Sequence, residues 1–526
     1  MLRKNLEILI ERCLKELQKE ESFPSFSLDR FSLRSPEGNN HGDYSSNMAL
    51  VLSKEVGRPP LEIAELLESK LQKEDMLEKV EIAGPGFINL FISKQYLEIE
   101  IKNTLKNKEN YDVIDIGKGK KVNVEFISAN PTGPLTVGNA RGGIIGNVLS
   151  KILTKAGWKV TKEYYFNDAG GQIDVLGHSV LKDDQSAYKG AYIDELHDKL
   201  KEGSAREIGK KAAKILIEEI KKTTKRMGVE FDVWTAEGRD LREKKKVEKI
   251  IAWMKEKDLA YELEGALWFK STQFGDDKDR VLIKSDGEPT YFAVDCAYHK
   301  NKLIERKFDR VIDIWGADHH GDIPRVKGFV KALGYEGKLD ILIHQFVRII
   351  KDGQEVRMSK RTGNYITIDE LLDEVGLDVT VFFFLMKSID THLNFDLNLA
   401  KEQSDKNPVY YIQYAYARIC SIIEKASGIK QEININLLSH PSELDLIKQL
   451  LKLPEIIEDT AKDYQIQRLP QYALDLATDF HRFYHNCRVI TEDKALSSSR
   501  LGLVASSKIA LENILKLMGV SAPEKM

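Results

Sequence analysis

"NPTGPLTVGNARGG", residues 130–143, is rich in glycine and proline and directly follows "KVNVEFI", residues 121–127, whose side chains alternate as in a β-strand. A glycine-rich turn between a strand and a helix presents free backbone amides to an anion, at the positive end of the helix dipole. The two stretches therefore predict an α/β domain with a ligand site beyond the end of this strand.

The sequence around this turn alternates between strand and helix patterns, which is typical of a parallel sheet with helices on its faces. We therefore predict a Rossmann-type domain. From about 176 to 280 the pattern is helical and highly charged, which predicts a helical insertion, and the sheet is expected to resume with "RVLIKSDGEPTYFAVD", residues 280–295. The other strand candidates are "VNVEFI" (122–127), "KVTKEYYF" (159–166), "RVIDIWGA" (310–317) and "LDILIHQFV" (339–347).

The chain of 526 residues is too long for one core, and its patterns divide it into three parts. Residues 1–110 combine amphipathic helices with a strand pair around "KVEIAGPGFINLFIS" (79–93), which predicts an N-terminal α+β domain. Residues 111–390 carry the Rossmann-type pattern with its insertion. Residues 391–526 have helical period and predict a C-terminal all-α bundle.

Composition excludes several classes of protein. The chain is 42% hydrophobic and 31% charged, has a net charge of -3, and contains no apolar run long enough for a bilayer. Its N-terminus carries acids among its bases, unlike a signal or transit peptide, so we expect a cytoplasmic protein without a membrane partner. Four widely spaced cysteines predict reduced thiols and no zinc knuckle. The net charge neither proves nor excludes an RNA partner.

The glycine-rich turn matches neither GxGxxG nor the P-loop pattern GxxxxGK[ST], which disfavours dinucleotide enzymes and Walker-type NTPases. Gly138 and the helix that starts near Asn139 still suit a phosphate. Ligands of open parallel sheets bind beyond the carboxyl ends of the strands, so Glu125 and Asn130 are candidates for a pocket. The alternative is that Glu125 lies on an edge strand and faces water.

Read together with "VRMSKRTGN", residues 356–364, the turn resembles the paired signatures of class I aminoacyl-tRNA synthetases, a His-x-Gly-His turn and a Lys-Met-Ser-Lys-Ser loop. Finer features resemble the arginyl-tRNA synthetase family, and the resemblance runs nearly end to end. The stretches that carry it are "HGDYSSN" (41–47), "AGPGFINLFIS" (83–93), "SANPTGPLTVGNARG" (128–142), "YYFNDAGGQI" (164–173), "PTYFAVDCAYH" (289–299), "WGADHHGDIPRVKG" (315–328) and "GVSAPEKM" (519–526).

The resemblance implies an enzyme that activates arginine with ATP and transfers it to tRNA(Arg), releasing AMP and pyrophosphate. It implies Mg²⁺ with ATP as a substrate complex, no tightly bound cofactor, and a monomer. Such chemistry needs positioned donors and cations more than a nucleophile. The implied catalytic residues are Thr136, Asn139, Lys360 and Arg361, and the implied ATP-binding residues are Pro134, Gly138, Asn139, Arg357, Met358, Ser359 and Lys360.

The sequence departs from the family's usual signatures at four positions. Thr136 and Asn139 replace the two histidines, and Arg357 and Arg361 replace the first lysine and the last serine. A neutral histidine donates a hydrogen bond to phosphate, and an asparagine amide or a threonine hydroxyl can also donate one. We therefore expect an active site that has lost the pH sensitivity of an imidazole.

The planar guanidinium of arginine calls for carboxylates and flat acceptors. The resemblance implies Glu125, Tyr291 and Asp295 for this group, with Asn130 and His319 at the amino acid's polar end. Tyr291 and Asp295 are four residues apart in a predicted helix opened by Thr290, so both project from one face. The alternative is that they are surface residues. A pocket that matches every guanidinium donor needs no editing domain.

Contacts with tRNA are implied at both ends of the chain. Tyr410 and Tyr414 can stack on anticodon bases, with Met526 nearby, and Asn47 is a candidate base contact of the N-terminal domain. The tyrosines of the first C-terminal helix can instead be core residues, because they recur at helical spacing.

Three alternatives stay open. The first is a metal site formed by Asp318, His319, His320 and Asp322, although we expect no dedicated metal centre in this protein. The second is a synthetase-like protein that binds RNA without catalysis, as the altered signatures allow. The third is a synthetase for another amino acid, which the missing cysteine pairs and the missing editing insertion disfavour.

Overall fold

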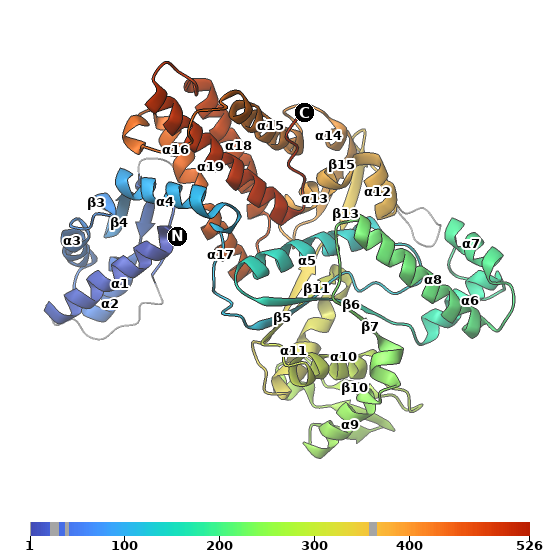
Figure 1. Ribbon diagram of the computed structural model, residues 1–526. Coiled ribbons are helices and arrows are strands. Elements are labelled where there is room, and N and C mark those ends of the chain that lie inside the picture. The colour runs from blue at the N-terminus through green and yellow to red at the C-terminus, as the bar shows by residue number, and fades with distance from the viewer. Residues whose placement is uncertain (1, 21–30, 37–40, 357–365) are drawn as a thin grey trace.

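The computed structural model describes residues 2–20, 31–36, 41–356 and 366–526. Figure 1 shows three parts, an N-terminal α+β domain, a central parallel sheet with its helices, and a C-terminal helical bundle. This confirms the predicted fold class, an α/β Rossmann-type domain flanked by an α+β domain and an all-α bundle.

The N-terminal domain is an antiparallel sheet of order β1-β2-β4-β3 covered by helices. Its first helix buries Leu6, Ile10 and Leu14, which recur at helical spacing. The elements are α1 (Leu2–Glu20), β1 (Leu33–Arg34), β2 (Tyr44–Ser46), α2 (Met48–Val56), α3 (Pro60–Leu71), β3 (Leu77–Ala83), β4 (Phe87–Ile92), α4 (Lys94–Asn107) and η2 (Lys108–Asn110).

The central sheet has five parallel strands in the order β12-β11-β5-β6-β7. Strand β5 is buried on both faces, as strands inside a parallel sheet are, with α5 along one face and α10 and α11 toward the other (Figure 1). The elements are β5 (Lys121–Glu125), α5 (Val137–Lys155), β6 (Lys159–Phe166), β7 (Val233–Ala236), α10 (Tyr291–Lys300), β11 (Arg310–Gly316), α11 (Ile323–Ala332) and β12 (Leu339–His344).

The segment between β6 and α10 differs in part from the sequence prediction. It begins with three helices as expected, but β7 then joins the parallel sheet, and Arg280–Ile283 (β10) pairs only in a separate antiparallel sheet of order β10-β9-β8. The prediction that the main sheet resumes at residue 280 is therefore wrong. The next strand of the main sheet is β7, and its four residues are too few to show the alternating pattern of a strand in the sequence. The elements are α6 (Gly171–Leu181), α7 (Ala191–Lys199), α8 (Ala205–Arg226), η3 (Glu237–Arg242), α9 (Lys246–Glu256), β8 (Ala260–Leu263), β9 (Ala266–Phe269) and η4 (Ser271–Phe274).

Beyond the central sheet lie a small sheet of order β14-β13-β15 and the helical bundle. The long bundle helices α15, α18 and α19 pack against one another. The elements are η5 (Asn301–Glu305), η6 (Ala317–Asp322), β13 (Val347–Lys351), β14 (Gln354–Glu355), α12 (Ile368–Val375), α13 (Leu377–Leu385), β15 (Leu393–Asp396), α14 (Leu397–Lys401), α15 (Pro408–Lys425), η7 (Ile435–Leu437), α16 (Pro441–Leu450), α17 (Leu453–Asp463), α18 (Arg468–Asn486) and α19 (Lys494–Met518).

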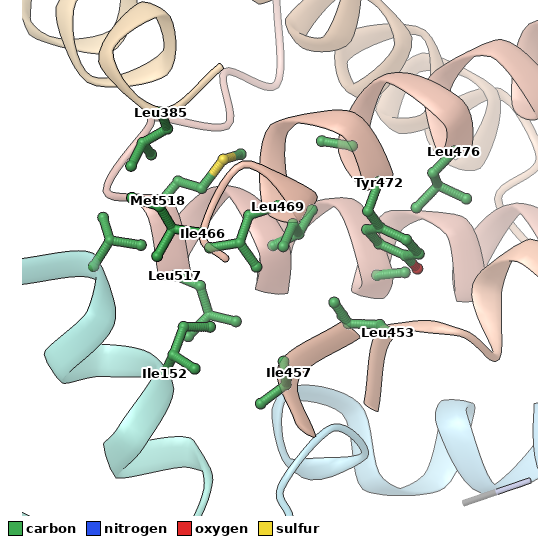
Figure 2. Close-up of a cluster of buried hydrophobic side chains, with 14 of the residues drawn as sticks. Ile152, Leu385, Leu453, Ile457, Ile466, Leu469, Tyr472, Leu476, Leu517 and Met518 are labelled. Carbon is green, nitrogen blue, oxygen red and sulfur yellow. The ribbon is translucent and has the colours of Figure 1, made fainter. Parts of the chain in front are cut away.

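One continuous core joins the sheet domain to the bundle. Figure 2 shows Ile152 of α5 next to Leu517 of α19, with Ile457 of α17 and Leu469 of α18 in the same cluster. All four side chains are buried. Because these contacts are apolar and closely packed, the bundle and the sheet are held in a defined relative position.

The N-terminal domain is attached to the bundle by charged contacts. The Arg3 guanidinium donates to Asp459 Oδ2 at 2.9 Å and to Glu458 Oε2 at 3.1 Å. The Tyr44 hydroxyl donates to Glu455 Oε1 at 2.5 Å, and the Ile435 amide donates to Glu98 Oε2 at 2.9 Å.

Candidate active site

The glycine-rich turn ends in a reciprocal cap at the start of α5. Thr136 is the N-cap, and its Oγ1 accepts from the Asn139 amide at 3.4 Å. Asn139 Oδ1 accepts from the Thr136 backbone amide at 3.1 Å and from the Thr136 hydroxyl at 2.9 Å. The Thr136 hydroxyl thus donates within the cap, whereas no described residue accepts a hydrogen bond from Asn139 Nδ2, which keeps the amide as a donor for a ligand.

The glycine-rich turn is hydrogen-bonded to the chain that follows the second signature segment. The basic-loop residues Arg357, Met358, Ser359, Lys360 and Arg361 are outside the described residues, but the chain is described again from Ile366. The Val137 amide donates to Ile366 O at 3.4 Å, and the Ile368 amide donates to Leu135 O at 3.0 Å. These bonds hold residues 366–368, which follow the basic stretch in the sequence, beside the N-terminus of α5.

The ATP-binding candidates Pro134 and Gly138 are partly exposed on the surface of this turn, as is Asn139. A Cβ added to Gly138 would meet only Thr136 Oγ1, at 3.6 Å, an ordinary contact. The bare backbone at Gly138 is therefore open for a flat ligand to approach.

Glu125 is the last residue of β5 and is only 5% exposed. Its Oε2 accepts from Lys302 Nζ at 2.5 Å, and its Oε1 accepts from Ser128 Oγ at 2.8 Å. The alternative of a water-facing glutamate on an edge strand is wrong, because β5 lies at the centre of the sheet. Burial raises the pKa of Glu125 and Lys302 opposes that rise. This carboxylate is already paired with a cation of the protein.

Asp295 has a different environment on α10. Thr290 caps the helix by accepting from the Ala293 amide at 3.3 Å, which confirms the predicted cap. No described residue donates a hydrogen bond to the Asp295 carboxylate, and Arg325 Nη2 is 4.0 Å away. Burial raises the pKa of Asp295 to about 7, although His299 and Arg325 oppose the rise. Tyr291, one turn earlier, is 63% exposed at the mouth of this region.

The candidates for the amino acid's polar end are held by their neighbours. Asn130 Nδ2 donates to Gln172 Oε1 at 2.7 Å, and Asn130 Oδ1 accepts from the Asn167 amide at 3.1 Å, which bridges the ends of β5 and β6. His319 is half exposed in η6, with its Nδ1 3.2 Å from Asp322 Oδ2.

The alternative of a metal centre in η6 gains no support from the geometry. Across the described parts of the chain, no three His, Cys, Asp or Glu side chains form a group that could hold a metal ion. All four cysteines are free thiols, as expected.

Sequence reasoning missed a second set of pocket residues. Glu237 is 1% exposed, and its carboxylate accepts from the Tyr165 hydroxyl at 2.6 Å and from Arg242 Nε at 2.7 Å. Burial raises the pKa of Tyr165, and the negative charges of Glu237, Asp295 and Glu125 raise it further. All three carboxylates are therefore close enough to act on the same tyrosine hydroxyl. Recognition of β7 in the sequence would have identified Glu237 as a candidate. Glu237 directly follows that strand, and ligand-binding residues of a parallel sheet lie beyond the carboxyl ends of its strands.

A parallel-sheet domain with this turn after its central strand, followed in the sequence by the basic stretch 356–364, is typical of class I aminoacyl-tRNA synthetases. The family model described as "tRNA synthetases class I (R), catalytic domain" matches residues 100–207 and 197–382. "Arginyl tRNA synthetase N terminal domain" matches residues 4–92, and "DALR anticodon binding domain" matches residues 412–526. The chain therefore belongs to the arginyl-tRNA synthetase family.

Curated relatives and a solved structure agree with this assignment. The chain is 43% identical to the arginine–tRNA ligase of Caldanaerobacter subterraneus over 98% of both chains. It is 41% identical to that of Acetivibrio thermocellus, over 100% of this chain and 99% of the relative. The arginyl-tRNA synthetase of Thermus thermophilus has the same fold, with a TM-score of 0.82 at 22% identity over 100% of both chains. Within the described residues, no helix is long and apolar enough to cross a membrane.

Proposed function

We propose that this chain activates arginine with ATP and transfers the arginyl group to tRNA(Arg), and that Asp295 is the carboxylate that binds the substrate guanidinium. The observation that carries the proposal is the pairing of the pocket acids. Glu125 bonds to Lys302 and Glu237 bonds to Arg242, whereas the Asp295 carboxylate has no hydrogen-bonded cation among the described residues. The Asp295 side chain is 33% exposed, so this carboxylate is open to an incoming cation.

The surroundings of Asp295 suit the shape of the ligand. A guanidinium is flat and carries five donors, so it favours a carboxylate beside aromatic faces. Tyr291 lies one turn before Asp295, and the Tyr165 ring lies among the pocket acids. In this proposal Asn130 and His319 hold the polar end of arginine, and Glu125 supports the pocket from behind.

ATP is proposed to bind at the start of α5. The positive end of the α5 dipole and the Asn139 Nδ2 donor suit its phosphates, and the exposed backbone at Gly138 suits its adenine. Mg²⁺ accompanies ATP as part of the substrate complex. We propose that Arg357, Met358, Ser359, Lys360 and Arg361 cover the triphosphate, because the chain that follows them is bonded to the same turn.

The anticodon is proposed to bind on the bundle, where a pocket is lined by Tyr414, Arg418, Tyr484 and Met526. Arg418 lies over both rings, 4.6 Å from the Tyr414 centroid and 4.9 Å from that of Tyr484. Tyr414 is 40% exposed and stacks on Tyr410 at 6.4 Å. Exposed aromatic rings beside a guanidinium suit unstacked RNA bases. Tyr416, by contrast, is a core residue at 3% exposure.

The N-terminal domain is proposed to contact the outer part of the same tRNA. Asn47 occupies the N-cap position of α2, and its Oδ1 accepts from the Ser32 backbone amide at 2.8 Å. This leaves the side-chain Nδ2 of Asn47 as a donor for a base. We retain residues 1–110, 111–390 and 391–526 as the functional divisions of a monomer, with the segment 176–280 as a partly helical insertion.

The test is arginine-dependent exchange of pyrophosphate into ATP, measured with and without tRNA, followed by aminoacylation of total tRNA with each of the twenty amino acids. We expect exchange and charging with arginine and with none of the other nineteen. Asp295→Asn is expected to raise the KM for arginine, while Asp286→Asn, in an exposed turn, leaves it unchanged. Tight tRNA binding without any exchange would support the binding-only alternative instead.

A further inference from the structure

Lys302 is a fully buried lysine directly behind the proposed arginine pocket. It lies in η5, just after α10, and its side chain is 0% exposed. Its Nζ is 2.5 Å from Glu125 Oε2 and 2.8 Å from Asp313 Oδ1, and it lies 4.3 Å from the centre of the Tyr298 ring. A buried ammonium is costly unless it is paired, so this lysine is held by defined partners.

The two carboxylates that Lys302 joins are direct neighbours in the sheet. Asp313 on β11 is in register with Glu125 on β5. Two buried like charges on adjacent strands repel each other, and a cation between them removes that repulsion. Burial alone raises the pKa of Asp313, yet Lys302 and His299 bring it down to about 2. Asp313 is therefore held as a carboxylate, and its pair with Glu125 is bridged by a cation of the protein itself.

The same contacts fix the helix that carries Asp295. Tyr291, Asp295, Tyr298 and Lys302 follow one another at helical spacing along one face. His299 adds a second bond to the sheet, with its Nε2 2.9 Å from Asp313 Oδ2 and its Nδ1 2.8 Å from the Asp295 carbonyl. The position of Asp295 is thus set by bonds made at the C-terminal end of its helix.

We propose that Lys302 is a positioning residue for arginine: it holds α10 against Glu125 and Asp313 and occupies both carboxylates, so that Asp295 is the carboxylate left to bind the substrate guanidinium. The inference rests on the proposed function. Lys302 itself contacts no substrate. A site in which one carboxylate lacks a hydrogen-bonded cation suits a singly charged side chain, and this arrangement depends on Lys302.

The test compares Lys302→Met with Lys302→Arg and with the control Lys300→Met, which changes a partly exposed lysine at the end of α10, two residues before Lys302. We expect Lys302→Met to raise the KM for arginine about tenfold or more while the KM for ATP stays within about twofold. We also expect the pH midpoint of the arginine KM to move upward, because a nearby positive charge has been lost. Lys302→Arg keeps the charge and should rescue part of both effects.

A purely structural lysine would behave differently. A lower melting temperature with an unchanged arginine KM and an unchanged pH midpoint in Lys302→Met would overturn the proposal. If Lys302→Met does not fold, Lys302→Gln, which also removes the charge, provides the same two measurements. The parent enzyme is assayed alongside: a parent without arginine-dependent exchange would refute the proposed function, whereas an active parent with an unaffected variant would refute only the role of Lys302.

Discussion

At the residue scale, the two altered signature positions share their hydrogen bonds with the helix cap. Asn139 Oδ1 accepts two bonds from Thr136, so the side-chain amide is oriented by the cap and directs Nδ2 away from it. The Thr136 hydroxyl donates inside the cap. Of the two replacements, Asn139 is therefore the better phosphate donor, and it has no titratable group near neutral pH.

Asn139→His tests this difference. We expect kcat for activation, at saturating arginine, to change more steeply between about pH 6 and 8 in the variant than in the parent, because an imidazole titrates there. Asn139→Ala should lower kcat by about 10²-fold, the effect of losing one oriented donor. A parent whose kcat depends on pH more steeply than that of Asn139→His would contradict the account.

The raised pKa of Asp295 predicts that arginine binding, rather than kcat, depends on pH. Its pKa of about 7 belongs to the free enzyme, and only the carboxylate pairs with a guanidinium. The KM for arginine should therefore be constant above about pH 8 and rise as the pH falls below 7, by about tenfold per unit at the limit. Asp295→Asn should have a high KM that is flat with pH. A flat profile in the parent would show that Asp295 does not bind the substrate.

At the scale of single elements, α5 positions the turn because it packs unusually close to the sheet. A Cβ on Gly146 would lie 2.2 Å from the Phe126 ring, so only glycine permits this approach. Gly138, eight residues earlier on the same helix, has an open environment. Gly146 therefore serves packing, and Gly138 is available for a ligand.

The two glycines predict opposite effects on stability. Gly146→Ala should destabilise the folded state by about 1–3 kcal/mol through overpacking. Gly138→Ala should leave stability unchanged or raise it by about 0.4–1 kcal/mol, while it raises the KM for ATP. Thermal unfolding checks the stabilities, and Phe126→Leu should relieve part of the cost of Gly146→Ala. Equal melting temperatures for the two glycine variants would contradict this reading.

At the scale of the whole molecule, the proposed sites for tRNA and for arginine lie on different parts of the chain. The proposed anticodon pocket lies on α15, α18 and the C-terminus, whereas the proposed arginine site lies on β5 and α10. The two parts share a continuous apolar core (Figure 2), and substitutions of exposed side chains at either site leave that core intact.

Tyr414→Leu and Tyr291→Ala form a reciprocal pair that tests this division. Tyr414→Leu should raise the KM for tRNA by about 5- to 100-fold, the loss of one stacking contact, and leave the KM for arginine unchanged. Tyr291→Ala should raise the KM for arginine and leave that for tRNA unchanged. Steady-state aminoacylation measures both, and a Tyr414 variant with normal tRNA kinetics would remove the anticodon from this pocket.

The sequence by itself determined the features that depend on neighbouring residues. The strand period of "VNVEFI", the glycine-rich turn after it and the Thr290 cap are local patterns, and each lies where it was predicted. The family resemblance, rather than residue types alone, pointed to Asp295, because a tyrosine and a carboxylate one helical turn apart can equally be surface residues.

Only the tertiary structure decided how the pocket charges are paired. Lys302 lies 177 residues from Glu125, and Tyr165 meets Glu237, 72 residues away, because β7 pairs with β6 in the sheet. The tertiary structure also decides that Tyr414 is exposed and Tyr416 is buried. Helices α18 and α19 pack against α15 and cover the face of α15 that carries Tyr416. Local patterns report what each segment can form, whereas the pairing of buried charges depends on which distant segments the folded core brings together.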